Sequence, residues 1–425
     1  MGISVKSLFS MVSPASAFCG SERAGLPACK FYSGRRKIHR CHCVFATMDV
    51  FSSDDIVLES LLGTYGYMSI SSYDPPKLDG GIESMTTSLN AKRFGGQEVD
   101  AGNVETRLYS GRVRRGPNTG TRILLKAYPV RNAGGHEADM MAANELSSHA
   151  ILQDSSMGKT CENIIVLLGG FETRTGEQWL VFRNDGIKSG ADYAMAAGVA
   201  TQKGISVGVW DFWDRFEKAE VLQRRHAFIR KLLAGAFTGL SFMHARGQLH
   251  QSLGPASVIL NTMEERNISM VLPRLRDLAF AVDVSNETLF RGADPKFGAL
   301  SDNLWRRAAA AGARTIFERK AFGIADDIFS GGLLLAYIVF ASLSVPGSVD
   351  APSLQRLLES TFRLDLTATR EYCMMDDRWE EAVKFLDLDN KAGWELLQVS
   401  EAMLNPDYRQ RPIADAVLCH RFMTG

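Results

Sequence analysis

A lysine and a glutamate stand at a spacing that could place a cation against a carboxylate inside the protein. Lys126 lies in a predicted strand at residues 122–128, and Glu145 follows nineteen positions later on a predicted helix. An amine that a strand carries into an apolar interior needs a carboxylate partner, because an unpaired buried charge is costly. The spacing alone is weak evidence, since such a pair could simply lock a strand to a helix.

The predicted elements around this pair fall into a strand-rich half and a helix-rich half. Strand patterns are expected at residues 106–113, 122–128, 163–171 and 178–182, with a helix at 136–153. A Gly-Pro-Asn-Thr-Gly turn joins the first two strands, as in a β-hairpin. Helical patterns dominate from residue 207, beginning with a long amphipathic segment at 210–240. This order predicts an α+β fold of two lobes with a cleft between them.

Five segments follow one another in a familiar order. Residues 122–126 read Arg-Ile-Leu-Leu-Lys, residues 240–250 read Leu-Ser-Phe-Met-His-Ala-Arg-Gly-Gln-Leu-His, and residues 250–260 continue as His-Gln-Ser-Leu-Gly-Pro-Ala-Ser-Val-Ile-Leu. Residues 275–281 read Leu-Arg-Asp-Leu-Ala-Phe-Ala, and residues 404–412 end in Arg-Gln-Arg-Pro. Together they resemble the motifs of the protein kinase superfamily, from the strand lysine to the Arg-Pro element before the last helix.

The resemblance covers roughly residues 95–423 and implies roles for several of them. It implies a small β-rich N-lobe at about 95–185 and a larger helical C-lobe at about 186–423. Lys126 would hold the α- and β-phosphates of ATP, with Glu145 as its ion-pair partner, and Asp277 would bind Mg²⁺. The resemblance also implies that Phe182, His250 and Leu278 pack in the core.

The phosphate-binding loop departs from the kinase pattern. Residues 108–111, Leu-Tyr-Ser-Gly, align with the kinase V-Y-x-G, which puts Ala101, Asn103 and Thr106 at the three loop glycines. Glycines let the backbone approach phosphates and donate N–H groups to them. We therefore expect weaker phosphate binding here.

The catalytic loop departs further, and no catalytic residue of it is intact. Ser252 stands at the position of the aspartate base, Gly254 at the lysine and Ser257 at the asparagine that binds a second magnesium ion. Loss of a positioned base typically costs about 10²–10⁴ in rate. Lys126, Glu145 and Asp277 survive, so the site could hold ATP, with one Mg²⁺ ion, or could be an ion-pair network that locks the lobes.

These departures predict a pseudokinase that acts as a binding or scaffold module for a protein partner of unknown identity. The alternative is a weakly active atypical Ser/Thr kinase. Residues 392–397, Ala-Gly-Trp-Glu-Leu-Leu, also resemble relatives of chloroplast thylakoid kinases, which makes thylakoid association possible. For this domain we expect boundaries at 95–423, preceded by an arm or linker at 48–94.

The N-terminal segment has the composition of an organelle transit peptide. Residues 1–47 hold seven basic residues, one acid, Glu22, and recurrent serines. We expect chloroplast import, with a mitochondrial destination or a disordered basic tail as alternatives. Removal of the segment leaves 41 of the 48 basic and 47 of the 48 acidic residues, a net charge of −6. Such a chain has no electrostatic footprint for nucleic acid.

An uncharged stretch at residues 328–349 is long enough to cross a bilayer. Its glycines and serines, and the two aspartates that precede it, favour a buried core helix over a membrane span. Outside the N-terminal segment, Cys161, Cys373 and Cys419 are scattered and predict neither a metal site nor a disulfide framework.

Overall fold

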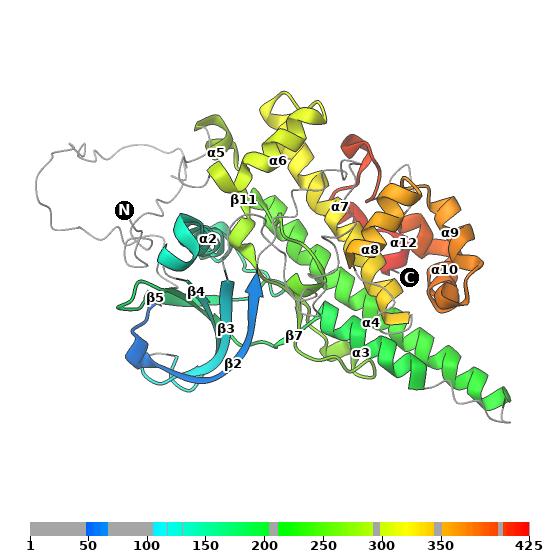
Figure 1. The fold of residues 1–425 in the computed structure, drawn as a ribbon, viewed down its shortest axis with the longest axis horizontal. Helices are drawn as coiled ribbons and strands as arrows, with labels where there is room; N and C mark the ends of the chain where they lie inside the picture. The colour runs from blue at the N-terminus through cyan, green and yellow to red at the C-terminus, as the bar shows by residue number, and fades with distance from the viewer. Residues whose placement is uncertain are drawn as a thin grey trace, which may run out of the picture.

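The computed structural model describes residues 48–66, 105–116, 118–129, 131–203, 211–291, 298–343, 351–397 and 403–424. Within these residues the chain is α+β, with a sheet in its N-terminal part and helices in its C-terminal part (Figure 1). The expected α+β class is therefore confirmed. The expected transit peptide at residues 1–47 lies outside the described residues.

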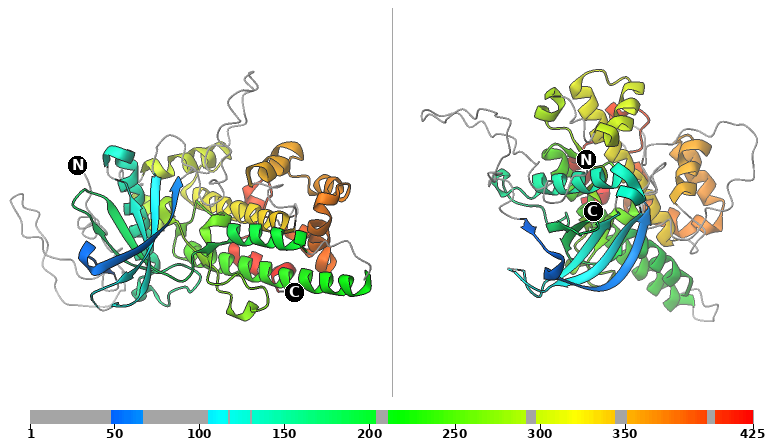
Figure 2. Two further views of the ribbon diagram at one scale, coloured as in Figure 1. Left: turned by 60° about the horizontal axis from the view of Figure 1, so that its bottom comes forward. Right: turned by 60° about the vertical axis from the view of Figure 1, so that its left-hand side comes forward.

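Six strands of the described chain form one mixed sheet in the order β1-β5-β6-β4-β3-β2. All neighbours pair antiparallel except β1 and β5, which are parallel. The strands are β1 (Asp49–Val50), β2 (Ile56–Gly66), β3 (Glu105–Val113), β4 (Arg122–Tyr128), β5 (Leu167–Glu172) and β6 (Gln178–Arg183). Figure 2 shows the twist of this sheet beside the helical part.

Side-chain alternation along β4 gives the sheet two apolar faces. Ile123, Leu125 and Ala127 pack with residues of β5 and β6 on one face. Leu124 and Tyr128 point to the other face, where helix α2 (Arg131–Leu152) covers them. Lys126 shares this second face, so the strand delivers its amine to the side that α2 covers.

The arm or linker expected at residues 48–94 is corrected for the part of it that the structure describes. Residues 49–50 and 56–66 belong to the sheet, because Asp49 pairs with Gly169 and β2 pairs along its whole length with β3. The remainder of that range, residues 67–94, lies outside the described residues. The Ser-Asp-Asp turn at 53–55 is capped at its start, where Ser52 and Asp55 form a capping box.

The helical part is built around one large core. Helices α3 (Gly190–Lys203), α4 (Asp211–Ala245), α7 (Ile316–Leu343) and α10 (Glu380–Leu397) contribute most of it. Smaller helices follow: α5 (Asn286–Arg291), α6 (Gly298–Ala310), α8 (Ala351–Arg356), α9 (Leu366–Met374), α11 (Ala414–Leu418) and α12 (Arg421–Thr424). Figure 1 shows α4 running alongside α3 and extending to one end of the molecule.

Helix α7 is long and apolar enough to cross a membrane, and it is the one such helix among the described residues. Residues 334–343 are all buried against the other helices. This burial supports the core-helix interpretation, because a lipid-facing helix would leave that surface uncovered.

Short elements connect the sheet to the helices. Strands β7 (Lys188–Ser189), β9 (Val258–Leu260) and β10 (Arg274–Leu275) form a three-stranded ribbon, and β8 (Gln248–Leu249) pairs with β11 (Val282–Asp283). Two short 3-10 turns, Pro255–Ser257 and Leu278–Phe280, begin immediately after Gly254 and Asp277. Ser257 lies in the first turn, and Asp277 immediately precedes the second.

Candidate functional site

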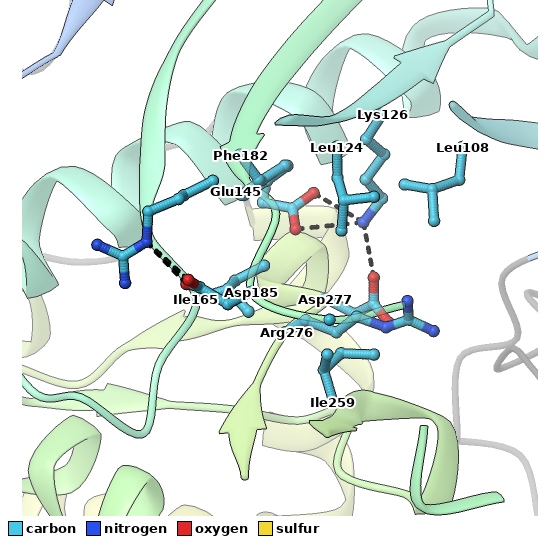
Figure 3. A pocket seen from close by; sticks show the side chains of 12 residues that line it. Leu108, Leu124, Lys126, Glu145, Ile165, Phe182, Asp185, Ile259, Arg276 and Asp277 are labelled. Atoms are coloured by element: carbon cyan, nitrogen blue, oxygen red, sulfur yellow. Dashed lines mark hydrogen bonds and ion pairs between the residues drawn. The ribbon is translucent and has the colours of Figure 1, made fainter. Parts of the chain in front are cut away.

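The Lys126 ammonium lies between two carboxylates. Its Nζ is 2.9 Å from Glu145 Oε2 and 3.2 Å from Glu145 Oε1, and 2.9 Å from Asp277 Oδ1 (Figure 3). The Lys126 and Glu145 side chains are only 5% and 1% exposed. The structure therefore brings together the three residues that the sequence singled out.

Glu145 is fixed by more than the lysine. The Tyr128 hydroxyl also donates to its carboxylate, and the main-chain N–H of Leu278 donates to Oε1 at 3.2 Å. The neighbouring Asn144 donates to the carbonyls of Ala279 and Ala281 at 2.9 and 2.7 Å. Helix α2 is thus bound both to the sheet and to the segment that follows Asp277.

Asp277 sits in the left-handed region, with φ of 66° and ψ of 56°. Aspartate tolerates this conformation better than most residues. Its Oδ1 accepts from Lys126, and its Oδ2 is 3.0 Å from Arg276 Nε. Burial works to raise the pKa of Asp277, but the two cations outweigh burial and hold the pKa below its ordinary value.

Ser252 does not face the cleft. It is 1% exposed, and its hydroxyl donates to the main-chain carbonyl of Asp277 at 2.6 Å. His250 Nδ1 accepts the Ser252 N–H at 3.2 Å and lies 3.1 Å from the hydroxyl. The other ring nitrogen of His250 lies 3.1 Å from the Arg276 carbonyl. The buried Ser252 side chain therefore stabilises the backbone at Asp277 through this hydrogen bond.

Ser257 is likewise turned to its own loop. Its hydroxyl donates to the Gly254 carbonyl at 2.8 Å and accepts the Gly254 N–H at 2.9 Å, and the residue is 4% exposed. Among the described residues, no group of three or more His, Cys, Asp or Glu side chains could hold a metal ion. At the expected Mg²⁺ site, both oxygens of the Asp277 carboxylate already contact protein cations.

Asp327 of α7 orders the loop that carries His250 and Ser252. Its carboxylate accepts the main-chain N–H groups of His250 at 2.8 Å and Gln251 at 2.9 Å, together with the Gln251 amide at 3.0 Å. His244 lies 2.9 Å from the same carboxylate. Burial works to raise the pKa of Asp327, but these contacts lower it below its ordinary value.

A narrow pocket adjoins these charges. Its lining includes apolar side chains from both parts of the molecule, namely Leu108, Leu124, Ile165, Phe182 and Ile259. It also includes six charged residues: Lys126, Glu145, Arg183, Asp185, Arg276 and Asp277. Figure 3 shows Leu108 and Leu124 on the sheet side and Ile259 on the opposite side. The cavity volume is about 30 Å³, which has room for about two water molecules. Pockets for cofactors are typically about 300–1,000 Å³.

The positions aligned with the kinase loop glycines fall at or just before the start of β3. Gly66 of β2 pairs with Glu105 of β3, so residues 67–104 join the two strands. Ala101 and Asn103, two of the positions aligned with loop glycines, lie outside the described residues. Thr106, the third, is buried near the start of β3, where the strand expected at residues 106–113 also begins.

Sequence reasoning found the charged trio but missed two residues beside it. Arg276 contacts Asp277, and the only available signal was its charge immediately before that aspartate. His149 of α2 is fully buried and packs edge-on against Phe182, with ring centroids 5.4 Å apart. Burial and the nearby Lys126 lower the pKa of His149 to about 3, so the ring is neutral at physiological pH. Phe182, His250 and Leu278 are buried, as expected.

Comparison with known proteins adds no assignment. No protein-family model matches the chain, and no curated protein matches it in sequence.

Proposed function

We propose that the protein is a pseudokinase: a two-lobed, protein-kinase-like fold that does not transfer phosphate and acts as a binding or scaffold module. The order of elements supports the proposal, with a sheet and one helix before a helical part and a pocket where they meet. The lysine–glutamate pair and the aspartate of the sequence motifs come together at this pocket.

The observation that carries the proposal is the orientation of Ser252. The residue at the position of the kinase base is buried and bonded to the Asp277 backbone, so it presents no proton acceptor to a substrate hydroxyl. A candidate base must lie within hydrogen-bond reach of the proton that it removes. Ser257 is equally occupied within its own turn.

Nucleotide binding is a separate part of the proposal. Lys126 could meet phosphate charge, but the pocket must widen before ATP can enter. A thermal shift measurement with millimolar ATP tests this part, since a ligand at 100 times its dissociation constant stabilises a protein by about 2.7 kcal/mol. The absence of a shift would leave the scaffold role alone.

A phosphoryl-transfer assay on the full chain tests the central claim. We expect no transfer of the ATP γ-phosphate to the protein itself or to generic protein substrates. Turnover that disappears in both Lys126→Met and Asp277→Ala would instead establish the alternative, a weakly active Ser/Thr kinase. The intact Lys126–Glu145 pair is the feature that favours this alternative.

The location of the protein is proposed from composition. The basic, acid-poor residues 1–47 support import into the chloroplast, with the mitochondrion as the second candidate. A fusion of residues 1–60 to a fluorescent reporter should accumulate in plastids. Cytosolic fluorescence would defeat the proposal. The partner is proposed to be a protein, at a thylakoid surface if the plastid assignment holds.

A further inference from the structure

Arg276 lies beside Asp277, the residue that the sequence resemblance aligns with the magnesium-binding aspartate of kinases. Its main-chain N–H donates to the Ser257 carbonyl at 2.9 Å. Its side-chain Nε donates to the Ala256 carbonyl and also lies against Asp277 Oδ2, each at 3.0 Å. The residue is 8% exposed. The Nε–H group of Arg276 is thus shared between the Ala256 carbonyl and the Asp277 carboxylate, which places the guanidinium beside the aspartate.

The two oxygens of Asp277 are shared between two protein cations. Lys126 contacts Oδ1, as Figure 3 shows, and Arg276 contacts Oδ2. Mg²⁺ needs near-octahedral oxygen ligands at about 2.0–2.1 Å and is usually held by carboxylates together with substrate phosphates. A divalent ion at Asp277 would have to displace at least one of these cations and would be repelled by the other.

The second ligand that the kinase arrangement would supply is also missing from this position. Ser257 commits its hydroxyl to Gly254 on both the donor and the acceptor side. The residues that are present therefore do not fit a kinase-type magnesium site. They fit an arrangement in which a protein cation, in place of a metal ion, balances the negative charge of Asp277.

We infer that Arg276 takes the place of the divalent cation and excludes Mg²⁺ from this site, including when the phosphates of a nucleotide are present. The inference rests on the proposed kinase-like arrangement of Lys126, Glu145 and Asp277. It names Arg276 as the residue that determines metal selectivity. Positive charge for a phosphate group then comes from the protein itself.

Electron paramagnetic resonance of Mn²⁺ in the presence of adenylyl imidodiphosphate tests the inference on the full-length protein. With the wild-type protein present, the Mn²⁺ signal should be the same as that of the metal–nucleotide solution alone. Arg276→Ala should bind Mn²⁺ at least about tenfold more tightly than the wild type, because a cation a few ångströms from the metal is removed. The double variant with Asp277→Asn should lose this binding again.

Arg183→Ala is the matched control. Arg183 lines the same pocket, but its Nε contacts Asp185 at 2.8 and 2.9 Å rather than Asp277. Removal of this arginine also lowers the positive charge of the pocket, yet it should produce no Mn²⁺ binding. Arg276→Gln, which keeps a polar chain of similar reach, provides a second neutral variant should Arg276→Ala fail to fold.

Two results would overturn the inference. One is Mn²⁺ bound by the wild type and lost in Asp277→Asn; the other is the absence of any gain in a folded neutral Arg276 variant. Metal binding by the wild type without phosphoryl transfer would remove this inference and leave the pseudokinase proposal standing. Phosphoryl transfer by the wild type would defeat the pseudokinase proposal itself.

Discussion

The Ser252 hydroxyl donates a 2.6 Å hydrogen bond to the main-chain carbonyl of Asp277. This bond joins the loop after β8 to the turn after β10, and it holds Asp277 in its left-handed conformation. The aspartate can then point its carboxylate at Lys126. One small hydroxyl thereby helps to set the geometry of the charged site, at the position that the sequence resemblance aligns with the kinase base.

Aspartate at this position, the residue that the proposed kinase-like arrangement would hold there, should damage the protein rather than activate it. Ser252→Asp would place a carboxylate against the Asp277 carbonyl oxygen in a buried site, where two acceptors face each other. We expect the free energy of unfolding to fall by more than about 2 kcal/mol, because a buried charged group would be left unsatisfied. Urea unfolding measures the change. Ser252→Ala, which loses one hydrogen bond, should cost about 1 kcal/mol. A folded Ser252→Asp variant of wild-type stability would contradict the assigned orientation.

Lys126→Met should destabilise the fold strongly. The substitution leaves Glu145 buried without its cation, and removal of one partner from a buried ion pair typically costs about 3–5 kcal/mol. The matched control is Lys384→Met, because Lys384 pairs with Glu380 and Glu381 while its side chain is 51% exposed. Exposed pairs contribute about 0–1 kcal/mol. Equal losses in the two variants, measured by urea unfolding, would argue against a structural role for the Lys126 pair.

Stability should depend on the protonation of His149. Its pKa is about 3 in the folded state and about 6.5 when unfolded, so only the unfolded chain takes up this proton between those values. The contribution of His149 is therefore fully present above pH 6.5 and is lost as the pH falls toward 3. Well below pH 6.5 each bound proton changes stability by about 1.4 kcal/mol per pH unit.

His149→Leu isolates that contribution. As the pH falls from 7 to 6 and 5, the free energy of unfolding should fall less steeply in the variant than in the wild type. The difference between the two slopes should correspond to the uptake of up to one proton on unfolding. The buried His250, whose pKa burial also lowers, remains in both proteins and cancels in the comparison. Identical pH slopes would show that His149 is protonated or solvated in the folded state.

Gly169→Ala should release strand β1 from the sheet. A Cβ atom at Gly169 would lie 1.8 Å from the Asp49 carbonyl oxygen, so the two strands could not stay paired. We expect faster proteolytic cleavage near residues 49–51 and a lower melting temperature. Gly158→Ala is the control, since Gly158 also has positive φ but has no atom within 4 Å of an added Cβ. Both variants carry the backbone strain, so the difference between them reports the clash. Equal protection of β1 in both would contradict the pairing.

Much of the site could be predicted from the sequence because its signals are local. The strand predicted at residues 122–128 has the same bounds as β4. The helix predicted at 136–153 is α2, which begins five residues earlier. A strand lysine and a helix glutamate at this separation meet because β4 and α2 pack directly on each other.

Other features depend on contacts that no local pattern reveals. Strand β2 has no clean alternation and was missed; Val57, Leu58 and Leu61 are all about half exposed because β2 is an edge strand. The inward turn of Ser252 follows from the backbone of Asp277, which lies on a different loop. The pairing of Arg276 with Asp277 depends on the Ala256 carbonyl, which fixes the guanidinium from across the ribbon.

The placement of β1 and β2 has a consequence for how the chain reaches its native state. Asp49 must find Gly169, and β2 must find β3 across residues 67–104, so the outer part of the sheet is assembled from sequence-distant segments. The entropy of closing such a connection grows only slowly with its length, but it must be overcome before any strand contact forms. Non-local pairing of this kind slows folding. The β3-β4-α2 unit, whose contacts are local, should therefore form first, and the N-terminal strands should add late to a sheet that already exists.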